Sequence, residues 1–221
     1  MNQVICTVDV VLLTIKGDGL SVALLKRERE PYQGVPALPG GFIQQREDAD
    51  ARAAALRMLK EKTGIDAPYL EQLATFSGPV RDPRGWSLSV AYYALVSYRV
   101  IERAGHPDLQ LVDVDQRLAL PFDHREIIDT AVARLRGKSQ YSSLPCYLAG
   151  DTFTLPQLQR IYEALMGEPL NKVSFRRKMT EMAMLEAVEG RMDAGGAHRP
   201  AQLYRLKPAL REKLALLERG L

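Results

Sequence analysis

The sequence is poor in the residues that build metal centres and disulfide frameworks. It has two cysteines and three histidines among 221 residues, and none of them stand at the spacing of a metal-binding motif. Cys6 and Cys146 are far apart, so we expect both to be buried free thiols in a reducing compartment. His106 and His198 have no metal-ligating neighbours, and we expect them at the surface. The sequence therefore predicts no metal site.

The chain also lacks any apolar run long enough to cross a membrane. Its first residues lead directly into the strand-like segment VICTVDVVLL, without the basic region of a targeting peptide. The apolar fraction of 46% and the charged fraction of 26% are those of a globular protein. We therefore expect a cytoplasmic protein with no membrane partner and with enough residues for two domains.

Charge is distributed unevenly between the two parts of the chain. Residues 125–221 carry 16 Lys and Arg against 11 Asp and Glu, a net charge of +5, whereas the first 124 residues carry a net charge of −2. This asymmetry suggests that the two parts meet different partners.

The N-terminal part alternates strand-like and helix-like segments. Strands are predicted at residues 4–15, 20–26, 72–77, 87–101 and 110–114, from their β-branched and aromatic residues. A single helix is predicted between Ala49 and Gly64, and an amphipathic linker helix at residues 124–136, which His124 caps or orients. This order predicts an α+β fold of the α/β/α sandwich type. The turn-rich segment 137–151 predicts a boundary, with a first domain at residues 1–150.

The remaining residues, 151–221, predict a winged helix-turn-helix. Thr154 and Gln157 form a capping-box pattern before a helical stripe. Asn171 can cap a second, basic helix that extends to about Leu185. Short strands at 185–188 and 202–206 then flank a basic tip at 190–200.

The segment from Leu38 to Ile65 resembles the Nudix box, with two substitutions and two extra residues. Eight positions agree with the pattern: Leu38, Pro39, Gly40, Gly41, Glu47, Arg57, Glu61 and Gly64. Met58 and Lys62 replace two glutamates of the pattern, and the segment between Glu47 and Arg57 is two residues longer. Nudix hydrolysis requires carboxylates that hold divalent cations against a pyrophosphate. We therefore expect Glu47, Arg57 and Glu61 to be a degenerate catalytic remnant, with no required cofactor and little use for Mg²⁺.

The second helix of the C-terminal part carries the predicted DNA-binding residues. Long cationic side chains on the exposed side of a packed helix can contact bases and phosphates. The predicted set is Lys172, Ser174, Arg176, Arg177, Lys178, Thr180, His198 and Arg199. We expect Arg177, in line with Val173 and Thr180, to contact base edges, and Arg176 and Lys178 to lean toward phosphates. Phe175, Met179 and Met182 form the apolar side.

The two-part chain resembles the Nudix-related transcriptional regulators of NAD metabolism in bacteria, over nearly its full length. LPGGFI at 38–43, RDPRGWS at 81–87, FDH at 122–124 and SFRRKM at 174–179 carry this resemblance. It implies a homodimeric repressor of NAD biosynthesis or salvage genes, bound to a palindromic duplex operator and sensing ADP-ribose or a related nucleotide. The dimer face is expected on helix 124–136 or on a terminal helix with Leu210, Leu214 and Leu217. The expected effector contacts are Arg27, Tyr32, Gly40, Gly41, Arg57, Arg81, Arg84 and Trp86, with Trp86 or Tyr32 stacking on adenine.

Two other classes of protein remain open from the sequence. One is a metal-dependent ADP-ribose pyrophosphatase in which Glu47 and Glu61 hold a reduced metal set. The other is a scaffolding protein whose C-terminal domain binds protein instead of DNA. Salt-dependent retention on duplex DNA separates the last class from a DNA-binding regulator, because phosphate contacts release counterions.

Overall fold

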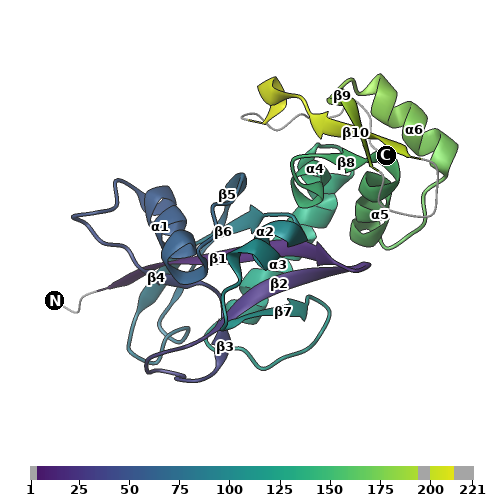
Figure 1. Cartoon of the computed structure of the whole chain (residues 1–221). Coiled ribbons are helices and arrows are strands. Elements are labelled where there is room, and N and C mark those ends of the chain that lie inside the picture. Colours follow the sequence, from purple (N-terminus) through teal and green to yellow (C-terminus); the bar gives the residue numbers. More distant parts are fainter. Residues whose placement is uncertain (1–3, 194–199, 212–221) are drawn as a thin grey trace. The chain divides into compact units, whose positions relative to one another are not determined.

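The computed structural model describes residues 4–193 and 200–211 (Figure 1). The chain forms two compact units whose boundary lies between Arg134 and Leu135, and the short segment 17–19 groups with the second unit. Within the described residues, no helix is long and apolar enough to span a bilayer. Cys146 is a buried free thiol, as expected, whereas the free thiol of Cys6 is only half-buried.

A seven-stranded mixed sheet forms the centre of the first unit. Its main path runs β3 (Pro36–Ala37), β2 (Gly19–Lys26), β1 (Ile5–Lys16), β6 (Ser87–Leu95) and β5 (Tyr69–Gly78), while β4 (Gly40–Phe42) pairs with β1 and β7 (Leu109–Asp113) pairs with β2. β1 and β6 run parallel with Val8 opposite Val90, and the other pairs are antiparallel. Four of the five predicted strands are confirmed with small changes at their ends.

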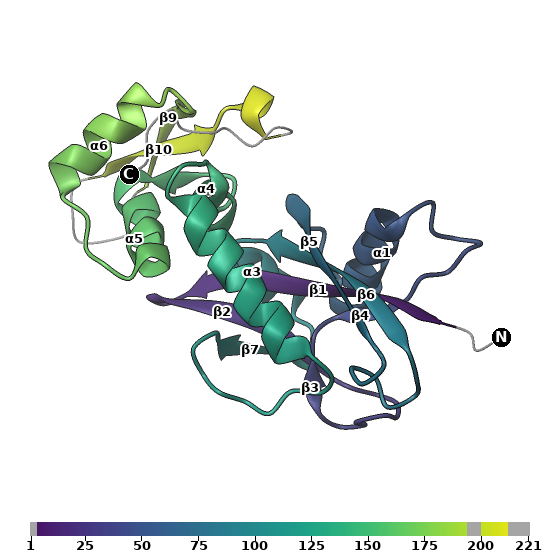
Figure 2. The ribbon, with the colours of Figure 1, turned by 180° about the vertical axis from the view of Figure 1, so that it is seen from behind.

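Helices cover both faces of this sheet. α1 (Ala51–Thr63) and α2 (Tyr98–Ala104) lie on one face, and α3 (His124–Ser139) lies on the other (Figures 1 and 2). Side chains alternate along β1, so Val8 and Val10 enter the core beside α1, whereas Asp9 points to the opposite side, toward His124. The predicted α/β/α sandwich is therefore confirmed.

The strand predicted at residues 87–101 is wrong in its last part. β6 ends at Leu95, and the chain turns into α2 after Ser97. Gly105 ends this helix in the left-handed region, with φ 57°, and its N–H donates to the carbonyl oxygen of Ile101. The β-branched residues of this segment favour a strand locally. The segment is nevertheless helical, because the helix places Ile101 in the hydrophobic core.

The second unit is a winged helix. It contains α4 (Leu144–Ala149), α5 (Leu155–Met166), α6 (Lys172–Glu181), a short 3₁₀ turn (Pro208–Leu210) and a sheet in the order β8 (Phe153–Thr154), β10 (Ala201–Leu206) and β9 (Leu185–Asp193). Both hydrogen bonds of the predicted capping box form between Thr154 and Gln157 at the start of α5. The Asn171 side chain caps α6 by accepting from the N–H groups of Val173 and Ser174. Both predicted helix starts are thus confirmed.

Two predicted boundaries lie elsewhere in the structure. Segment 137–151 contains α4, whose residues Leu144–Leu148 are buried, so the two units divide earlier than residue 150. Its Ser and Pro residues start a short helix instead of a linker: Ser143 is the N-cap and Pro145 stands in the first turn. α6 ends at Glu181, short of Leu185, because Ala183 adopts a φ of 48° and redirects the chain toward β9. His198, Arg199, Leu214 and Leu217 lie outside the described residues.

Candidate functional site

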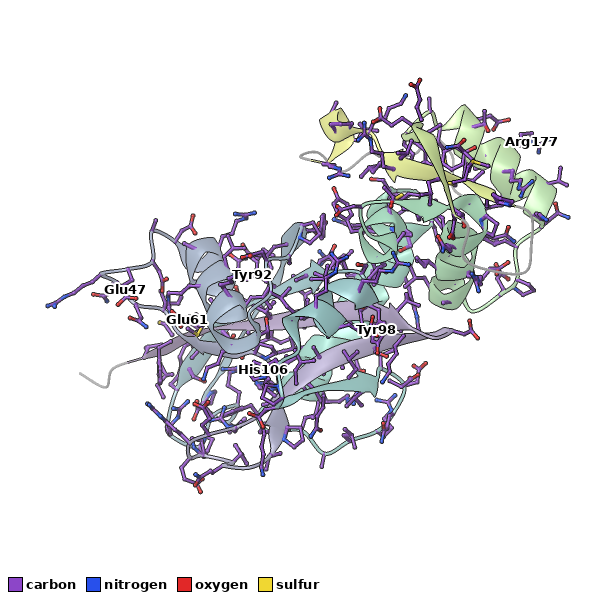
Figure 3. The ribbon with its side chains drawn as sticks, in the orientation of Figure 1. Glu47, Glu61, Tyr92, Tyr98, His106 and Arg177 are labelled. Carbon is purple, nitrogen blue, oxygen red and sulfur yellow. The ribbon has the colours of Figure 1, made fainter. Side chains whose placement is uncertain are left out.

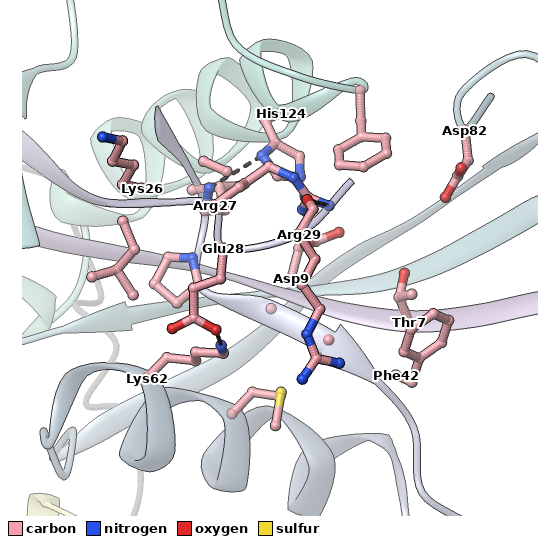
Figure 4. Close-up of a pocket in the computed structure, with 18 of the residues that line it drawn as sticks. Thr7, Asp9, Lys26, Arg27, Glu28, Arg29, Phe42, Lys62, Asp82 and His124 are labelled. Atoms are coloured by element: carbon pink, nitrogen blue, oxygen red, sulfur yellow. Dashed lines mark hydrogen bonds and ion pairs between the residues drawn. The ribbon is translucent and has the colours of Figure 1, made fainter. Parts of the chain in front are cut away.

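A cavity of about 460 Å³ opens on the first unit (Figure 4). It lies where residues 38–41, here called the glycine loop, lead into β4 beside the first part of β1 and the end of β2. Its lining contains both cationic and acidic side chains. The cationic members are Lys26, Arg27, Arg29, Lys62, Arg81 and Arg84, and the acidic members are Asp9, Glu28, Glu30, Glu61 and Asp82. Such a lining suits a charged, polar ligand, and the ion pairs within it decide which cations are free to bind one.

Gly40 brings the glycine loop into close contact with β1. A Cβ atom at Gly40 would lie 2.3 Å from Asp9 Oδ1 and 2.6 Å from the carbonyl oxygen of Val8. Asp9 is buried and accepts a hydrogen bond of 2.6 Å from Ser89 Oγ. Only glycine fits at this position without a steric clash, so the loop lies directly against the buried carboxylate of Asp9.

Two of the predicted phosphate-binding arginines are already paired. Arg81 donates to both carboxylate oxygens of Asp123, at 2.8 and 2.7 Å, and its side chain is 8% exposed. Arg84 donates to both oxygens of Asp82, at 3.0 and 2.7 Å. Arg81 and Arg84 both line the cavity. However, the positive charge of each is already balanced by a bidentate ion pair with a carboxylate of the protein.

Arg27 differs from them because it forms no ion pair with the described residues. Its Nε donates to the carbonyl oxygen of Pro31 at 2.8 Å, and its guanidinium carbon lies 4.8 Å from the centre of the Phe122 ring. Burial and the nearby charge of Arg84 lower the pKa of Arg27. A half-buried cation that lacks a carboxylate partner is a favourable position for an anionic ligand.

His124 anchors the glycine loop to the start of α3. Its ring is 2% exposed, and its Nδ1 accepts a hydrogen bond of 3.1 Å from the N–H of Leu38. Burial lowers the pKa of His124, and this bond requires Nδ1 to be unprotonated, so the ring is neutral with its proton on Nε2. Nε2 lies 3.6 Å from Asp9 Oδ1. Of the two predicted roles, capping is wrong, because His124 is the first residue of α3, whereas its bond to Leu38 is of the kind that orients the start of the helix.

Several side chains of the Nudix-box segment are engaged in contacts within the chain. Met58 is buried and fills the space against Gly41, where a Cβ would lie 2.4 Å from its sulfur. The Lys62 ammonium forms an ion pair of 3.3 Å with Glu28, and Glu61 forms one of 3.3 Å with Arg57. Glu47 lies exposed on the loop before α1 and Glu61 lies on the helix (Figure 3), and both carboxylates act electrostatically on Arg57. The thioether of Met58 and the ammonium of Lys62 cannot supply the oxygen ligands that Mg²⁺ prefers, whereas the Nudix pattern has carboxylates at both positions.

Three of the predicted effector contacts do not line the cavity. Arg57 is bound by Asp48 through both carboxylate oxygens at 2.7 Å, a bond that lowers the pKa of Asp48 to about 2. Tyr32 packs edge-on against Phe122 with ring centres 5.0 Å apart, and Trp86 is a half-exposed surface residue. The other predicted contacts, Arg27, Gly40, Gly41, Arg81 and Arg84, do line the cavity.

The structure adds cavity residues that the sequence interpretation missed. They include Asp9, Phe42, Asp82, Phe122 and His124. Phe42 is 54% exposed at the cavity, and the Arg84 guanidinium lies 5.3 Å from its ring centre. A single carboxylate inside the apolar strand VDVVLL was the available signal for Asp9.

The second unit presents α6 as a polar surface on a packed helix. Its predicted DNA-binding residues Lys172, Ser174, Arg176, Arg177 and Thr180 are exposed, and Lys178 is half-buried. Val173, in line with Arg177, is 76% exposed, whereas Phe175 and Met179 are buried. Met182 is half-buried at the end of the helix. Arg177 extends outward in Figure 3 and forms an ion pair with the exposed Glu181, at 3.7 Å.

Comparison with known proteins identifies both units. Residues 6–133 match the NUDIX domain family, and residues 145–206 match the NrtR DNA-binding winged helix domain. The chain is 41% identical over 203 residues to the ADPR responsive transcriptional repressor NtrR of Acinetobacter baylyi, covering 90% of this chain and 80% of that protein.

Solved structures give the same result. NrtR of Shewanella oneidensis, crystallised with a 27mer DNA, is similar with a TM-score of 0.89 and 38% identity over 98% of this chain and 99% of that one. The NUDIX domain of the same protein, crystallised with ADP ribose, has a TM-score of 0.56 and 39% identity over 61% of this chain and 90% of that one.

The fold and the sites define a Nudix-domain protein with a C-terminal DNA-binding winged helix. The chain belongs to the NrtR family of transcriptional repressors.

Proposed function

We propose that the chain is a bacterial repressor of NAD biosynthesis or salvage genes, which senses ADP-ribose or a related nucleotide. The observation that carries the proposal is the presence, in one chain, of a charged Nudix cavity in which Met58 and Lys62 stand at two carboxylate positions of the Nudix box, and of a winged helix with an exposed basic α6. The ADPR-responsive name of the Acinetobacter relative and the ADP ribose bound to the Shewanella domain support the choice of effector.

We propose that Arg27 is the main phosphate contact of this effector. Its charge has no carboxylate partner among the described residues, whereas Arg81 and Arg84 are each bidentately paired. Gly40 and Gly41 shape the loop that faces the ligand. Phe42 offers the adenine an exposed ring inside the cavity, a position that Trp86 does not have.

A gel shift tests the function directly. We expect the full chain to retard a duplex taken from the region upstream of its own gene, and we expect ADP-ribose to change the affinity for that duplex. Arg27→Ala should raise the ADP-ribose concentration needed for this change while the affinity without effector stays the same. A shift that ADP-ribose leaves unaltered at millimolar concentration would disprove the sensing role.

The Nudix domain is expected to bind ADP-ribose without consuming it quickly. Met58 and Lys62 replace two carboxylates, and the remaining Glu61 is paired with Arg57. Turnover with Mg²⁺ should therefore lie far below the usual enzymatic range of about 1–10³ s⁻¹. Release of AMP measured by chromatography checks this, and a rate within that range would favour the pyrophosphatase alternative.

We propose that the repressor binds a palindromic operator as a homodimer, as winged and helix-turn-helix proteins commonly do. The apolar side of α3, one predicted dimer face, is buried within the chain at Ile127, Ile128, Ala131, Val132 and Leu135. That face is therefore unavailable to a second copy. Sedimentation with operator DNA should give two chains per duplex, and one chain per duplex would contradict the proposal.

A further inference from the structure

Lys62 lines the cavity from the last turn of α1, at a position where the Nudix-box pattern has a glutamate. Its ammonium reaches toward Glu28, on the segment after β2, and the two groups form an ion pair of 3.3 Å (Figure 4). Glu28 also lines the cavity. A positive charge therefore stands where the pattern has a carboxylate, and a carboxylate from a different segment balances it.

The ion pair at Lys62 is more readily exchanged than those at the cavity residues Arg81 and Arg84. Each of these arginines holds its carboxylate through two hydrogen bonds, and the Arg81 side chain is only 8% exposed. The Lys62 side chain is 39% exposed, that of Glu28 is 74% exposed, and the two meet in a single contact. Exposed pairs of this kind contribute little to stability. A phosphate group that enters the cavity can therefore displace the Glu28 carboxylate at small cost.

An ammonium group can take the place of a metal ion in binding a diphosphate, but it cannot take its place in cleaving one. Lysine binds phosphate as a compact point charge with three hydrogen-bond donors. A metal ion neutralises the same charge and also binds a water molecule, whose pKa it lowers to give the attacking hydroxide. The Lys62 ammonium has no coordination position for such a water. A lysine at this position therefore favours a ligand that is bound and left intact.

We propose that Lys62 is a second diphosphate contact of the cavity, and that it exchanges Glu28 for the ligand when the effector binds. Arg27, from the segment after β2, and Lys62, from α1, line the same cavity and supply one cation each. The ligand class is a nucleoside diphosphate bound without a metal bridge. This inference rests on the proposed function, since it requires ADP-ribose to occupy this cavity.

Lys60 separates this role from a general stabilisation of the helix. Lys60 and Lys62 both stand in the last turn of α1, where a positive charge is favourable to the helix dipole. Lys60 also forms an ion pair, of 2.5 Å with Asp66, but it is not among the cavity residues. Lys60→Gln therefore removes an equal charge and an ion pair from the same turn without touching the effector.

Calorimetric titration of the full chain with ADP-ribose tests the contact. Lys62→Gln should raise the dissociation constant about 10- to 100-fold, the range that corresponds to the loss of a hydrogen bond to a charged group. Lys62→Arg keeps a cation and should retain most of the affinity, and Lys60→Gln should equal the native chain. The native affinity should be the same in EDTA and in millimolar Mg²⁺, because the cations of the chain itself neutralise the diphosphate.

Glu28→Gln should have the opposite effect. It frees the Lys62 ammonium before the ligand arrives, so the dissociation constant for ADP-ribose should fall by up to about 5-fold, the equivalent of an exposed ion pair. A residue that merely supported the fold of the segment would give weaker binding when substituted. The melting temperatures of all four variants check that each one is folded.

The outcomes distinguish this inference from the proposed function. A native chain that does not bind ADP-ribose overturns both. If the native chain binds ADP-ribose and Lys62→Gln binds it equally well, the role of Lys62 is overturned and the sensing function stands. Equal losses in Lys60→Gln and Lys62→Gln, a weaker affinity in Glu28→Gln, or native binding that requires Mg²⁺ would also overturn the role of Lys62 and leave the function intact.

Discussion

Replacing Arg177 with alanine should weaken operator binding by about 1–3 kcal/mol and relax the preference for its sequence. Arg177 is exposed on the same side of α6 as Val173 and Thr180, opposite the buried Phe175. Its weak contact with Glu181, at 3.7 Å, leaves its donors available for a base edge. Competition titrations with operator and scrambled duplexes measure both effects.

Arg176→Ala provides the contrasting result. Arg176 is expected to contact phosphates, so its loss should weaken all duplexes alike and reduce the slope of log K against log salt by about one. Arg99→Ala removes an equal charge from an exposed position of the Nudix unit and controls for net charge. All three variants should keep the native melting temperature. If the double variant of Arg176 and Arg177 bound the operator normally, α6 would not be the reading helix.

Gly40→Ala should have the largest effect on the Nudix domain. The added Cβ would lie 2.6 Å from the backbone oxygen of Val8 and 2.3 Å from the buried Asp9 carboxylate. The backbone oxygen cannot move away without breaking the pairing of β4 with β1. Overpacking of this kind costs typically about 1–3 kcal/mol or more, and it also displaces the loop that forms the cavity. Thermal unfolding and ADP-ribose titration should both show the loss.

Gly41→Ala is the matched comparison at the next position. Its Cβ would meet only the Met58 side chain, with the sulfur at 2.4 Å. Because a thioether side chain adapts its rotamer, we expect a smaller loss, largely relieved in the double variant Gly41→Ala with Met58→Ala. Equal melting temperatures for Gly40→Ala and the native chain would show that the loop is not fixed against β1.

Local signals in the sequence predicted much of the fold because their physics is local. The Thr154 capping box, the Asn171 cap and the glycine after α1 each depend on a few neighbouring residues, and all three are present. The strand predicted through residue 101 failed because burial of Ile101 overrides its β-branched character. The turn formers of 137–151 suggested a linker, but Ser143 and Pro145 stand at the start of a short helix whose residues are buried.

The cavity was predicted only in part because its geometry joins distant segments. The Asp9–Ser89 and Leu38–His124 hydrogen bonds span 80 and 86 residues, and no local pattern encodes such pairs. Arg57 was expected at the ligand, but Asp48, a neighbour in the longer segment after Glu47, binds it instead. Three of the predicted arginines, Arg27, Arg81 and Arg84, line the cavity, whereas the ion pairs of Arg81 and Arg84 were not visible in the sequence.

The ion pair between Lys62 and Glu28 disfavours a glutamate at position 62, where the Nudix-box pattern has one. A glutamate restored at position 62 would face Glu28 and replace an attraction of 3.3 Å with repulsion between like charges. A glutamate at position 58 would enter a buried site shaped around a thioether beside Gly41. The residues around positions 58 and 62 therefore disfavour single substitutions toward the Nudix-box pattern.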